Sequence, residues 1–387
     1  MLLGLAPLFL SSGIGAVATP VFLRSINSGT ELIGIASSIG LLLSILFPPL
    51  FGRLGMRFSN RNAIALCLLL DGAASLIILS FRNVAAFIVS RALSRLIPTC
   101  AAVCSYTYLV QMSVGDAARS RSMVAMTTLS ASLPAFGYLI GGFLADRSVT
   151  LAFTVQAIMM FTATPIILLA EKDIPTLEKL GSVKTILAQE NPVAAFKRCL
   201  RSAPAGTPLL FVLVSAISIG YALFDQSFIY YLQIRLHVPV SMSGVVRAVI
   251  GAIAILVNFT ITMALVQRFN SAKAIIPITL LCAAASGCAA FTGTEAAFII
   301  AGGLFYASIN VLLAFQNKIF GDFAAKGNSE LLSSCNYTVD CFASAAGSLA
   351  AGFIYNIGPL LPYAGAAILY LCIPAVAVMI RRRAYSS

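Results

Sequence analysis

The chain has 387 residues, of which 59% are apolar and only 10% are charged. A soluble globular domain carries about 25% charged residues and about 45–50% apolar ones. So few charged side chains cannot cover the surface of a water-soluble protein of this length. The composition therefore excludes a soluble enzyme, a disordered chain and a nucleic-acid-binding arm, and the lipid bilayer is the solvent that suits it.

Apolar runs long enough to cross a membrane recur along the whole chain. Hydrocarbon offers no hydrogen-bond partners to the backbone, so each run must be a helix of about 20 residues. The sequence predicts twelve spans, at 2–23, 32–51, 62–80, 84–109, 122–145, 149–170, 207–232, 242–266, 272–291, 295–317, 331–355 and 359–380. We expect an all-α polytopic membrane protein with an N-terminal six-helix bundle (1–170), a cytoplasmic linker (171–206) and a C-terminal six-helix bundle (207–387).

The distribution of Lys and Arg predicts the orientation in the membrane. Eighteen of the 25 cations lie in the linker, the C-terminal tail and alternate loops, against four in the opposite loops and three inside spans. Cytoplasmic loops are enriched in Lys and Arg. Both termini and the linker are therefore expected in the cytoplasm, and the net charge of +12 needs no nucleic-acid partner.

The end of the first run leaves one alternative. Ala16-Val17-Ala18 resembles a signal-peptidase site. No Lys or Arg precedes the run, however, and its removal would leave eleven spans. We therefore expect this segment to remain as the first span.

The two predicted bundles share an internal repeat. Ala85-Ala86-Phe87-Ile88 recurs as Ala296-Ala297-Phe298-Ile299, at an offset of 211. The glycines of the fifth span, Gly137 and Gly142, match Gly347 and Gly352 at an offset of 210. Two parallel repeats with a working site near the bilayer midplane are typical of secondary transporters that use alternating access.

Several stretches resemble one transporter family over the whole chain. The loop after the second span carries Gly52, Arg53, Arg57 and Arg61, and the fourth span contains Phe87-Ile88-Val89-Ser90-Arg91. The fifth span contributes Pro134, Gly137, Gly141 and Gly142. These motifs, with Asn191–Lys197 of the linker and Tyr230–Gln233 of the seventh span, resemble the major facilitator superfamily, in particular its tetracycline-resistance-type branch and the animal orphan relatives of that branch.

The resemblance implies a carrier that moves a small organic solute by alternating access, in the specific form of drug– or metabolite–proton antiport. Two departures favour a uniporter or facilitator of an organic anion instead. The first span reads Leu10-Ser11-Ser12-Gly13-Ile14-Gly15, where members of the branch often carry Asp, and Gly55 replaces the Asp of the loop motif. A receptor or scaffold that kept the fold without transport is the third alternative.

Ionisable residues inside the predicted spans are the most informative candidates. Three cations (Arg91, Arg95, Arg247) and three acids (Asp71, Asp225, Asp340) lie there. A charge at bilayer depth costs at least about 2.5–3.5 kcal/mol, so it normally faces the bundle interior, where it is paired or hydrated. Arg91 and Arg95 are four residues apart on one helical face, where guanidinium groups could bind a carboxylate or phosphate. The alternative is that Arg91 only pins its helix to a neighbour, for example through Asp71.

Arg91 and Asp225 lie at similar predicted depth, roughly 10 Å below the outer boundary, so they could meet between the two halves. Arg91, Arg95, Asp225, Gln226 and Tyr230 are therefore expected to line the substrate cavity.

Asp225, Asp340 and Asp71 are the proton-coupling candidates, since a membrane-embedded carboxyl group can load and release a proton near neutral pH. The sequence has one His, no cysteine cluster at ligand spacing, no nucleotide-binding loop and no catalytic triad signature. We accordingly expect a monomeric carrier of a small organic solute, with protons as the candidate coupling ion and without a metal, a cofactor or an enzymatic activity.

Overall fold

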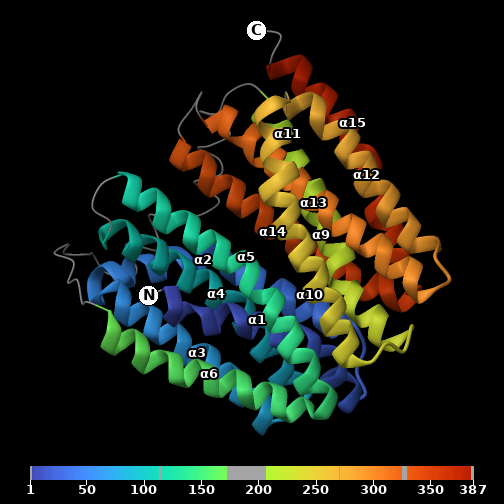
Figure 1. Ribbon diagram of the computed structural model, residues 1–387. Coiled ribbons are helices and arrows are strands. Elements are labelled where there is room, and N and C mark those ends of the chain that lie inside the picture. Colours follow the sequence, from blue (N-terminus) through green and yellow to red (C-terminus); the bar gives the residue numbers. More distant parts are fainter. Residues whose placement is uncertain (1, 113–115, 172–205, 270, 325–328, 385–387) are drawn as a thin grey trace. The chain divides into compact units, whose positions relative to one another are not determined.

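The computed structural model describes residues 2–112, 116–171, 206–269, 271–324 and 329–384. Within these ranges every regular element is a helix (Figure 1). The elements of the first part are α1 (Leu2–Ser25), α2 (Glu31–Phe58), α3 (Asn60–Ser80), α4 (Val84–Met112), α5 (Asp116–Arg147) and α6 (Val149–Ala170). Those of the second part are α9 (Thr207–Ile234), α10 (Val240–Val257), η1 (Asn258–Thr262), α11 (Met263–Arg268), α12 (Ser271–Phe291), α13 (Glu295–Ala324), α14 (Ser329–Ile357) and α15 (Leu361–Ala384).

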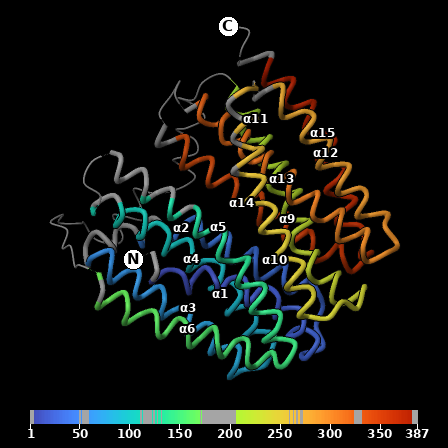
Figure 2. The backbone as a smooth tube through the Cα atoms, in the orientation of Figure 1, coloured from blue at the N-terminus to red at the C-terminus, as the bar shows by residue number. Residues whose placement is uncertain are grey.

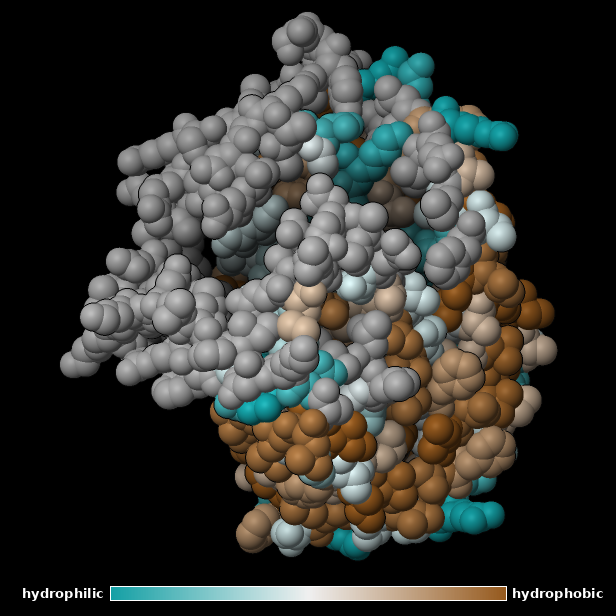
Figure 3. All heavy atoms as spheres, turned by 60° about the vertical axis from the view of Figure 1, so that its left-hand side comes forward, coloured by the Kyte–Doolittle hydropathy of each residue, from teal (hydrophilic) through white to brown (hydrophobic). Residues whose placement is uncertain are grey.

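Among the described residues, twelve helices are long and apolar enough to cross a membrane. This number confirms the prediction of an all-α polytopic membrane protein. Large apolar side chains lie on the outside of these helices, and Phe291, Leu169 and Ile300 are 89%, 87% and 71% exposed. On the face drawn in Figure 3, apolar residues cover a broad continuous area. Such a surface is stable against lipid chains and unsuited to water.

One prediction about the spans needs correction. The stretch from Gly52 onward was expected to form a loop, but α2 continues to Phe58 and α3 begins at Asn60. Only Ser59 separates the two helices, with a φ of 86°. Leu, Met and Arg in this stretch favour helix, and a membrane helix can extend beyond the hydrocarbon until a residue breaks it. The span expected at 242–266 is confirmed as one apolar helical run, Val240–Thr262, whose last turn at Asn258–Thr262 is π-helical and leads directly into α11.

The chain divides into two compact units. Unit 1 consists of Met1–Leu32, Ile39–Gln189 and His237–Gly251, and unit 2 consists of Ile33–Ser38, Glu190–Leu236 and Ala252–Ser387. Parts of α2 and α10 are thus grouped with the other repeat's helices. The predicted linker, 171–206, lies almost wholly outside the described residues.

Corresponding helices pack in the same way inside each unit (Figure 2). In unit 1, α1 packs against α5 and α6, and α3 packs against α4 and α6. In unit 2, α9 packs against α14 and α15, and α12 packs against α13 and α15. These pairs correspond under the offset near 211, so the sequence repeat has a structural counterpart.

Matched glycines lie where corresponding helices pack closely in the two units. A Cβ at Gly137 of α5 would collide with the carbonyl oxygen of Leu10 in α1. A Cβ at the repeat partner, Gly347 of α14, would lie 2.8 Å from the carbonyl oxygen of Ile219 in α9. Small residues let membrane helices approach until their backbones touch.

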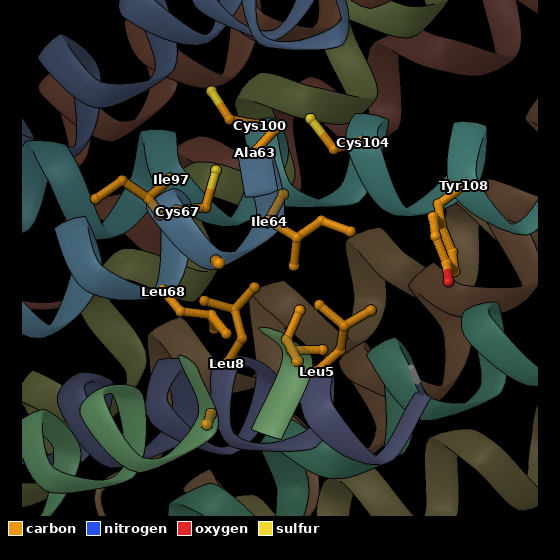
Figure 4. Packing of buried hydrophobic residues seen from close by; sticks show 14 of the residues in the cluster. Leu5, Leu8, Ala63, Ile64, Cys67, Leu68, Ile97, Cys100, Cys104 and Tyr108 are labelled. Carbon is orange, nitrogen blue, oxygen red and sulfur yellow. The ribbon is translucent and has the colours of Figure 1, made fainter. Parts of the chain in front are cut away.

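The apolar core of unit 1 holds α1, α3 and α4 together. Leu5 and Leu8 of α1 face Ile64 and Leu68 of α3, and all four side chains are at most 1% exposed (Figure 4). Cys67, Cys100 and Cys104 are buried in the same cluster. One turn further along each helix, this core gives way to the polar residues described below.

Replacing either matched glycine should destabilise the fold. We expect Gly137→Val and Gly347→Val each to reduce the free energy of unfolding by about 1–3 kcal/mol, because the new side chain forces packed helices apart. Thermal unfolding, followed with a dye that fluoresces on reacting with newly exposed thiols, measures the effect.

Gly321→Ala is the matched control, since a Cβ at Gly321 meets nothing within 4 Å. Its midpoint should stay at or above that of the unmodified chain, because alanine favours helix over glycine. Equal midpoints for Gly137→Val and Gly321→Ala would contradict the packing described here.

Candidate functional site

A buried polar cluster joins three helices of unit 1. The Ser11 hydroxyl of α1 donates to Oδ2 of Asp71 in α3 at 3.1 Å. Nε2 of Gln156 in α6 donates to Oγ of Ser11 at 2.8 Å. Ser11, Asp71 and Gln156 are 1%, 2% and 3% exposed. Their hydrogen bonds are therefore made inside the helix bundle, away from its lipid-facing surface.

Arg91 of α4 completes this cluster. Its guanidinium group interacts electrostatically with the Asp71 carboxyl and with Arg95 one turn away. A Cβ at Gly15 of α1 would lie 3.1 Å from Nη1 of Arg91 and 3.3 Å from Oε1 of Gln156. The absent side chain of Gly15 thus leaves room for both groups, and Arg91 and Gln156 border one small region.

Three buried polar atoms in this region have no hydrogen-bond partner among the described residues. They are Nε of Arg91, Nε of Arg95 and Oε1 of Gln156. Leaving a buried polar atom unsatisfied costs about 1–3 kcal/mol, and more for charged groups. Such a concentration of unsatisfied donors and acceptors is typical of a site that a ligand completes.

The surrounding sequence explains why these groups converge. Ser11 and Asp71 each lie three residues beyond a core leucine, Leu8 and Leu68, so they continue the buried face of the helix. Gly72, next to Asp71, brings α3 against α6, since a Cβ there would lie 3.1 Å from the ring of Phe161. The apolar core and the glycine contacts together place the polar side chains.

Unit 2 holds the other two acids of the predicted site. The Tyr306 hydroxyl of α13 donates to Oδ1 of Asp225 in α9 at 2.9 Å. The Ser218 hydroxyl of α9 donates to Oδ1 of Asp340 in α14. Each carboxyl group therefore has a hydroxyl donor from a neighbouring helix.

Two further cavity candidates lie near Asp225 on α9. Gln226 donates from Nε2 to Oγ of Ser348 at 3.4 Å, and the rings of Tyr230 and Tyr355 pack edge to face with centroids 5.3 Å apart. Asp225, Gln226 and Tyr230 thus follow one another on α9 with partners in α13 and α14. Because Arg91 belongs to unit 1 and Asp225 to unit 2, their predicted meeting stays a prediction.

The loop motif has one described side chain, that of Arg61. Its Nη1 donates to the carbonyl oxygens of Leu168 at 3.2 Å and of Glu171 at 3.3 Å. Arg61 therefore fastens the start of α3 to the C-terminal end of α6, where the helix dipole favours a cation. The backbones of Gly52, Arg53 and Arg57 lie in α2, and the side chains of the two arginines fall outside the described part of the chain.

The motif of helix five forms contacts on two sides of α5. Pro134, Gly137 and Gly141 face α1, where a Cβ at Gly141 would lie 2.5 Å from Cα of Ile14. Gly142 faces the part of α10 that belongs to unit 1, and a Cβ there would lie 3.0 Å from Cα of Gly244. These residues serve close helix packing in the structure.

Arg247 is the third cation inside the spans. It lies on the same part of α10, with its guanidinium carbon 5.2 Å from the centre of the Tyr138 ring of α5. Near the end of these helices Oγ of Ser241 donates to Oδ2 of Asp146 at 2.8 Å. The cation–π geometry gives Arg247 a packing role within unit 1.

Several residues of these clusters were not singled out as site residues from the sequence. Ser11 and Gly15 lie in the stretch where related carriers often have Asp, and Tyr306 is the repeat counterpart of Arg95. The position of these three residues in the motif or in the repeat could have identified them from the sequence. Gln156 and Ser218 gave none, because a lone polar residue in an apolar helix also occurs for packing.

Comparison with known proteins identifies the class. A family model of the Major Facilitator Superfamily matches residues 1–316. This match covers more than half of the chain, so the chain belongs to that superfamily and is an integral, multi-pass membrane protein of a transporter family. No curated protein matches the sequence.

Solved transporters share the fold. The human organic anion transporter MFSD10 (TETRAN) is 15% identical, with a TM-score of 0.68 over 97% of this chain and 97% of that chain. The nucleoside transporter NupG is 11% identical, with a TM-score of 0.71 over 98% and 96%. A bacterial homolog to the human lysosomal transporter Spinster, inward-facing and unoccupied, is 12% identical, with a TM-score of 0.70 over 98% and 93%. At these identities the likeness concerns the fold alone.

Removing the central hydroxyl of the unit 1 cluster should destabilise the protein. In Ser11→Ala, Asp71 loses its donor and Gln156 loses its acceptor. We expect the free energy of unfolding to fall by about 1–3 kcal/mol, measured by the same thiol-reactive thermal assay.

The neighbouring residue supplies the control. Ser12 is exposed, and its hydroxyl donates to the carbonyl oxygen of Phe9 in the same helix at 2.7 Å. Ser12→Ala should leave the unfolding midpoint nearly unchanged. A Ser11→Ala midpoint equal to that of Ser12→Ala would mean that the cluster contributes nothing to stability.

Proposed function

We propose that this chain is a secondary carrier that moves a small organic anion across a membrane by alternating access. The observation that carries the proposal is the pair Arg91 and Arg95 on one face of α4. The Nε atom of each is buried and has no hydrogen-bond partner among the described residues. The anion would be a carboxylate or a phosphate, which guanidinium groups bind through paired hydrogen bonds.

The cost of burial supports a binding role over a purely structural one. Asp71 offsets one positive charge in this region, while Arg91 and Arg95 bring two. Two like charges one helical turn apart repel each other, so packing alone would favour an apolar residue at one of the positions. An anionic solute would neutralise the excess charge and use the unsatisfied N–H groups.

Energy would come from a solute or proton gradient. Asp71, Asp225 and Asp340 are the groups that could couple transport to protons, and each holds a hydroxyl partner that can donate or accept. The resemblance of the sequence motifs implied antiport with protons. Facilitated transport of the anion alone is the simplest form that the two arginines support.

The arrangement in the membrane completes the proposal. Two six-helix bundles, 1–170 and 207–387, would rock about a central site, with the linker and both termini in the cytoplasm. The bias of Lys and Arg toward one set of loops supports this orientation. The carrier would work as a monomer, since each chain contains both repeats.

Replacing Arg91 tests the proposal. In proteoliposomes containing the purified chain, a panel of radiolabelled organic anions, cations and neutral solutes should identify anions as the transported class. For the best anion, Arg91→Gln should weaken apparent affinity about tenfold to a hundredfold, since a charge-assisted hydrogen bond contributes about 1.5–3 kcal/mol. Arg91→Lys should recover part of the loss, because it restores the charge without the paired donors.

Arg82→Gln provides the matched control. Arg82 is exposed, and its Nη2 donates to Oγ1 of Thr150 at 2.7 Å, away from the polar cluster. This variant should transport like the unmodified chain. Unchanged affinity in Arg91→Gln would exclude the arginine site, and a complete lack of flux for every solute would favour a receptor or scaffold with this fold.

A further inference from the structure

The Ser11 hydroxyl fixes the direction of the hydrogen bonds in the unit 1 cluster. A serine hydroxyl has one proton to donate, and an ionised carboxylate can only accept. Ser11 therefore gives its proton to Asp71 and must accept from Gln156, which offers Nε2 at 2.8 Å. As a result, the amide oxygen of Gln156 makes no bond to Ser11, and it borders Gly15, where a Cβ would lie 3.3 Å from Oε1 and 3.6 Å from Nε2.

This orientation of the hydrogen bonds, which requires an ionised Asp71, disfavours an anion beside Arg91. Oε1 of Gln156 is buried without a hydrogen-bond partner, and so is Nε of Arg91. An anion placed beside Nη1 of Arg91 would therefore meet an amide oxygen, which repels it. The region at Gly15 presents an acceptor to an anion while Asp71 is ionised.

We propose that protonation of Asp71 reverses the hydrogen-bond chain Asp71–Ser11–Gln156 and thereby turns the region at Gly15 into a binding site for a carboxylate. The protonated carboxyl group donates to Oγ of Ser11, and the Ser11 hydroxyl donates to the amide oxygen of Gln156. A half-turn of the Gln156 amide then exchanges its two ends, so that the NH₂ group takes the place of the oxygen beside Gly15. One proton is bound, and the only bonds exchanged are hydrogen bonds.

Two effects of this reversal favour the anion. The Gln156 amide now presents its NH₂ donor, in place of its oxygen acceptor, to an anion beside Nη1 of Arg91. At the same time the neutral Asp71 no longer offsets the charge of Arg91. Proton binding and anion binding therefore strengthen each other, and by reciprocity the protein must take up a proton when the anion binds. This inference rests on the proposed anion carrier and gives it a specific form, proton–anion symport.

The titratable and charged neighbours of Asp71 are few among the described residues. From α4 they are Arg91 and, through its effect on Arg91, Arg95; Ser94 of the same helix also interacts with the carboxyl group. From its own helix it is Cys67. Helices α1 and α6 contribute the uncharged Ser11 and Gln156. Asp71 is thus the carboxyl group of this cluster, and the proposed proton is bound there.

Two probes that differ at one functional group test the chemistry. Pyruvate carries only acceptors, whereas lactate carries a hydroxyl donor beside its carboxylate. Pyruvate should lose about tenfold to a hundredfold in affinity as pH rises through the titration of Asp71, the usual size of coupling between two sites. Lactate should lose less, because its hydroxyl can donate to Oε1 of Gln156 when Asp71 is ionised.

Proton uptake provides a readout that does not depend on transport. The purified full-length chain in weakly buffered detergent solution is mixed with pyruvate, and a pH-sensitive dye reports protons taken up. Binding itself is measured by equilibrium dialysis with radiolabelled pyruvate. We expect close to one proton per bound pyruvate in the pH range where affinity is falling.

Variants separate the chain reversal from simple charge effects. Asp71→Asn should bind pyruvate with pH-independent affinity and no proton uptake, because the asparagine amide donates to Ser11 and holds the chain in the reversed direction. Ser11→Ala breaks the hydrogen-bond chain but keeps the charge of Asp71. The difference between pyruvate and lactate in the pH dependence of affinity should therefore disappear. Glu295→Gln removes an exposed acid at the start of α13 and should retain both proton uptake and the probe difference.

The outcomes that overturn the proposal are distinct. Pyruvate bound without proton uptake, or with proton release, would eliminate the chain reversal and leave the anion carrier standing. Proton uptake that persists in Asp71→Asn would assign the coupling to another residue. An unchanged probe difference in Ser11→Ala would reduce the effect to charge alone. Failure of both pyruvate and lactate to bind would exclude small carboxylates as ligands and this proposal with them, whereas a phosphate-bearing anion found in the transport panel would leave the anion carrier standing.

Discussion

The interaction on which the rest of this structure depends is the hydrogen-bonded contact between Ser11, Asp71 and Gln156 inside an apolar bundle. In water each of these groups would be hydrated, and their mutual contacts would contribute little. Between lipid-facing helices they must find partners in the protein, so α1, α3 and α6 are held in one arrangement. Arg91 adds a positive charge to the same region, beside the Asp71 carboxyl group.

Close helix packing makes that cluster possible. Lipid provides no hydrophobic drive for one helix to bind another, so association depends on shape and on small residues. Gly137 and Gly141 bring α5 against α1, and Gly15 leaves space for the ends of Arg91 and Gln156. Gly347 makes the equivalent contact in unit 2, where α14 packs against α9. Duplication of this packing accounts for the shared offset of the sequence motifs.

The sequence was sufficient for the fold because the bilayer imposes length, hydropathy and charge rules on every span. The sequence was less informative where helices leave the hydrocarbon, because these rules no longer apply there. A loop was expected from Gly52 onward, but α2 continues through Gly52 and Arg57. Arg91 and Asp71 could be singled out because charges in apolar runs are costly. Gln156 could not, since only the packing of α6 against α1 reveals that its amide reaches Ser11.

The central claim is that Asp71 changes its protonation state when a carboxylate binds. Infrared difference spectroscopy on a chain labelled with ¹³C at the aspartate carboxyl groups measures this directly. On adding pyruvate at a pH where Asp71 is ionised, the account predicts a new carbonyl stretch of a protonated carboxylic acid, shifted by the label and missing in Asp71→Asn. A spectrum without that band, or with the same band in Asp71→Asn, would contradict it.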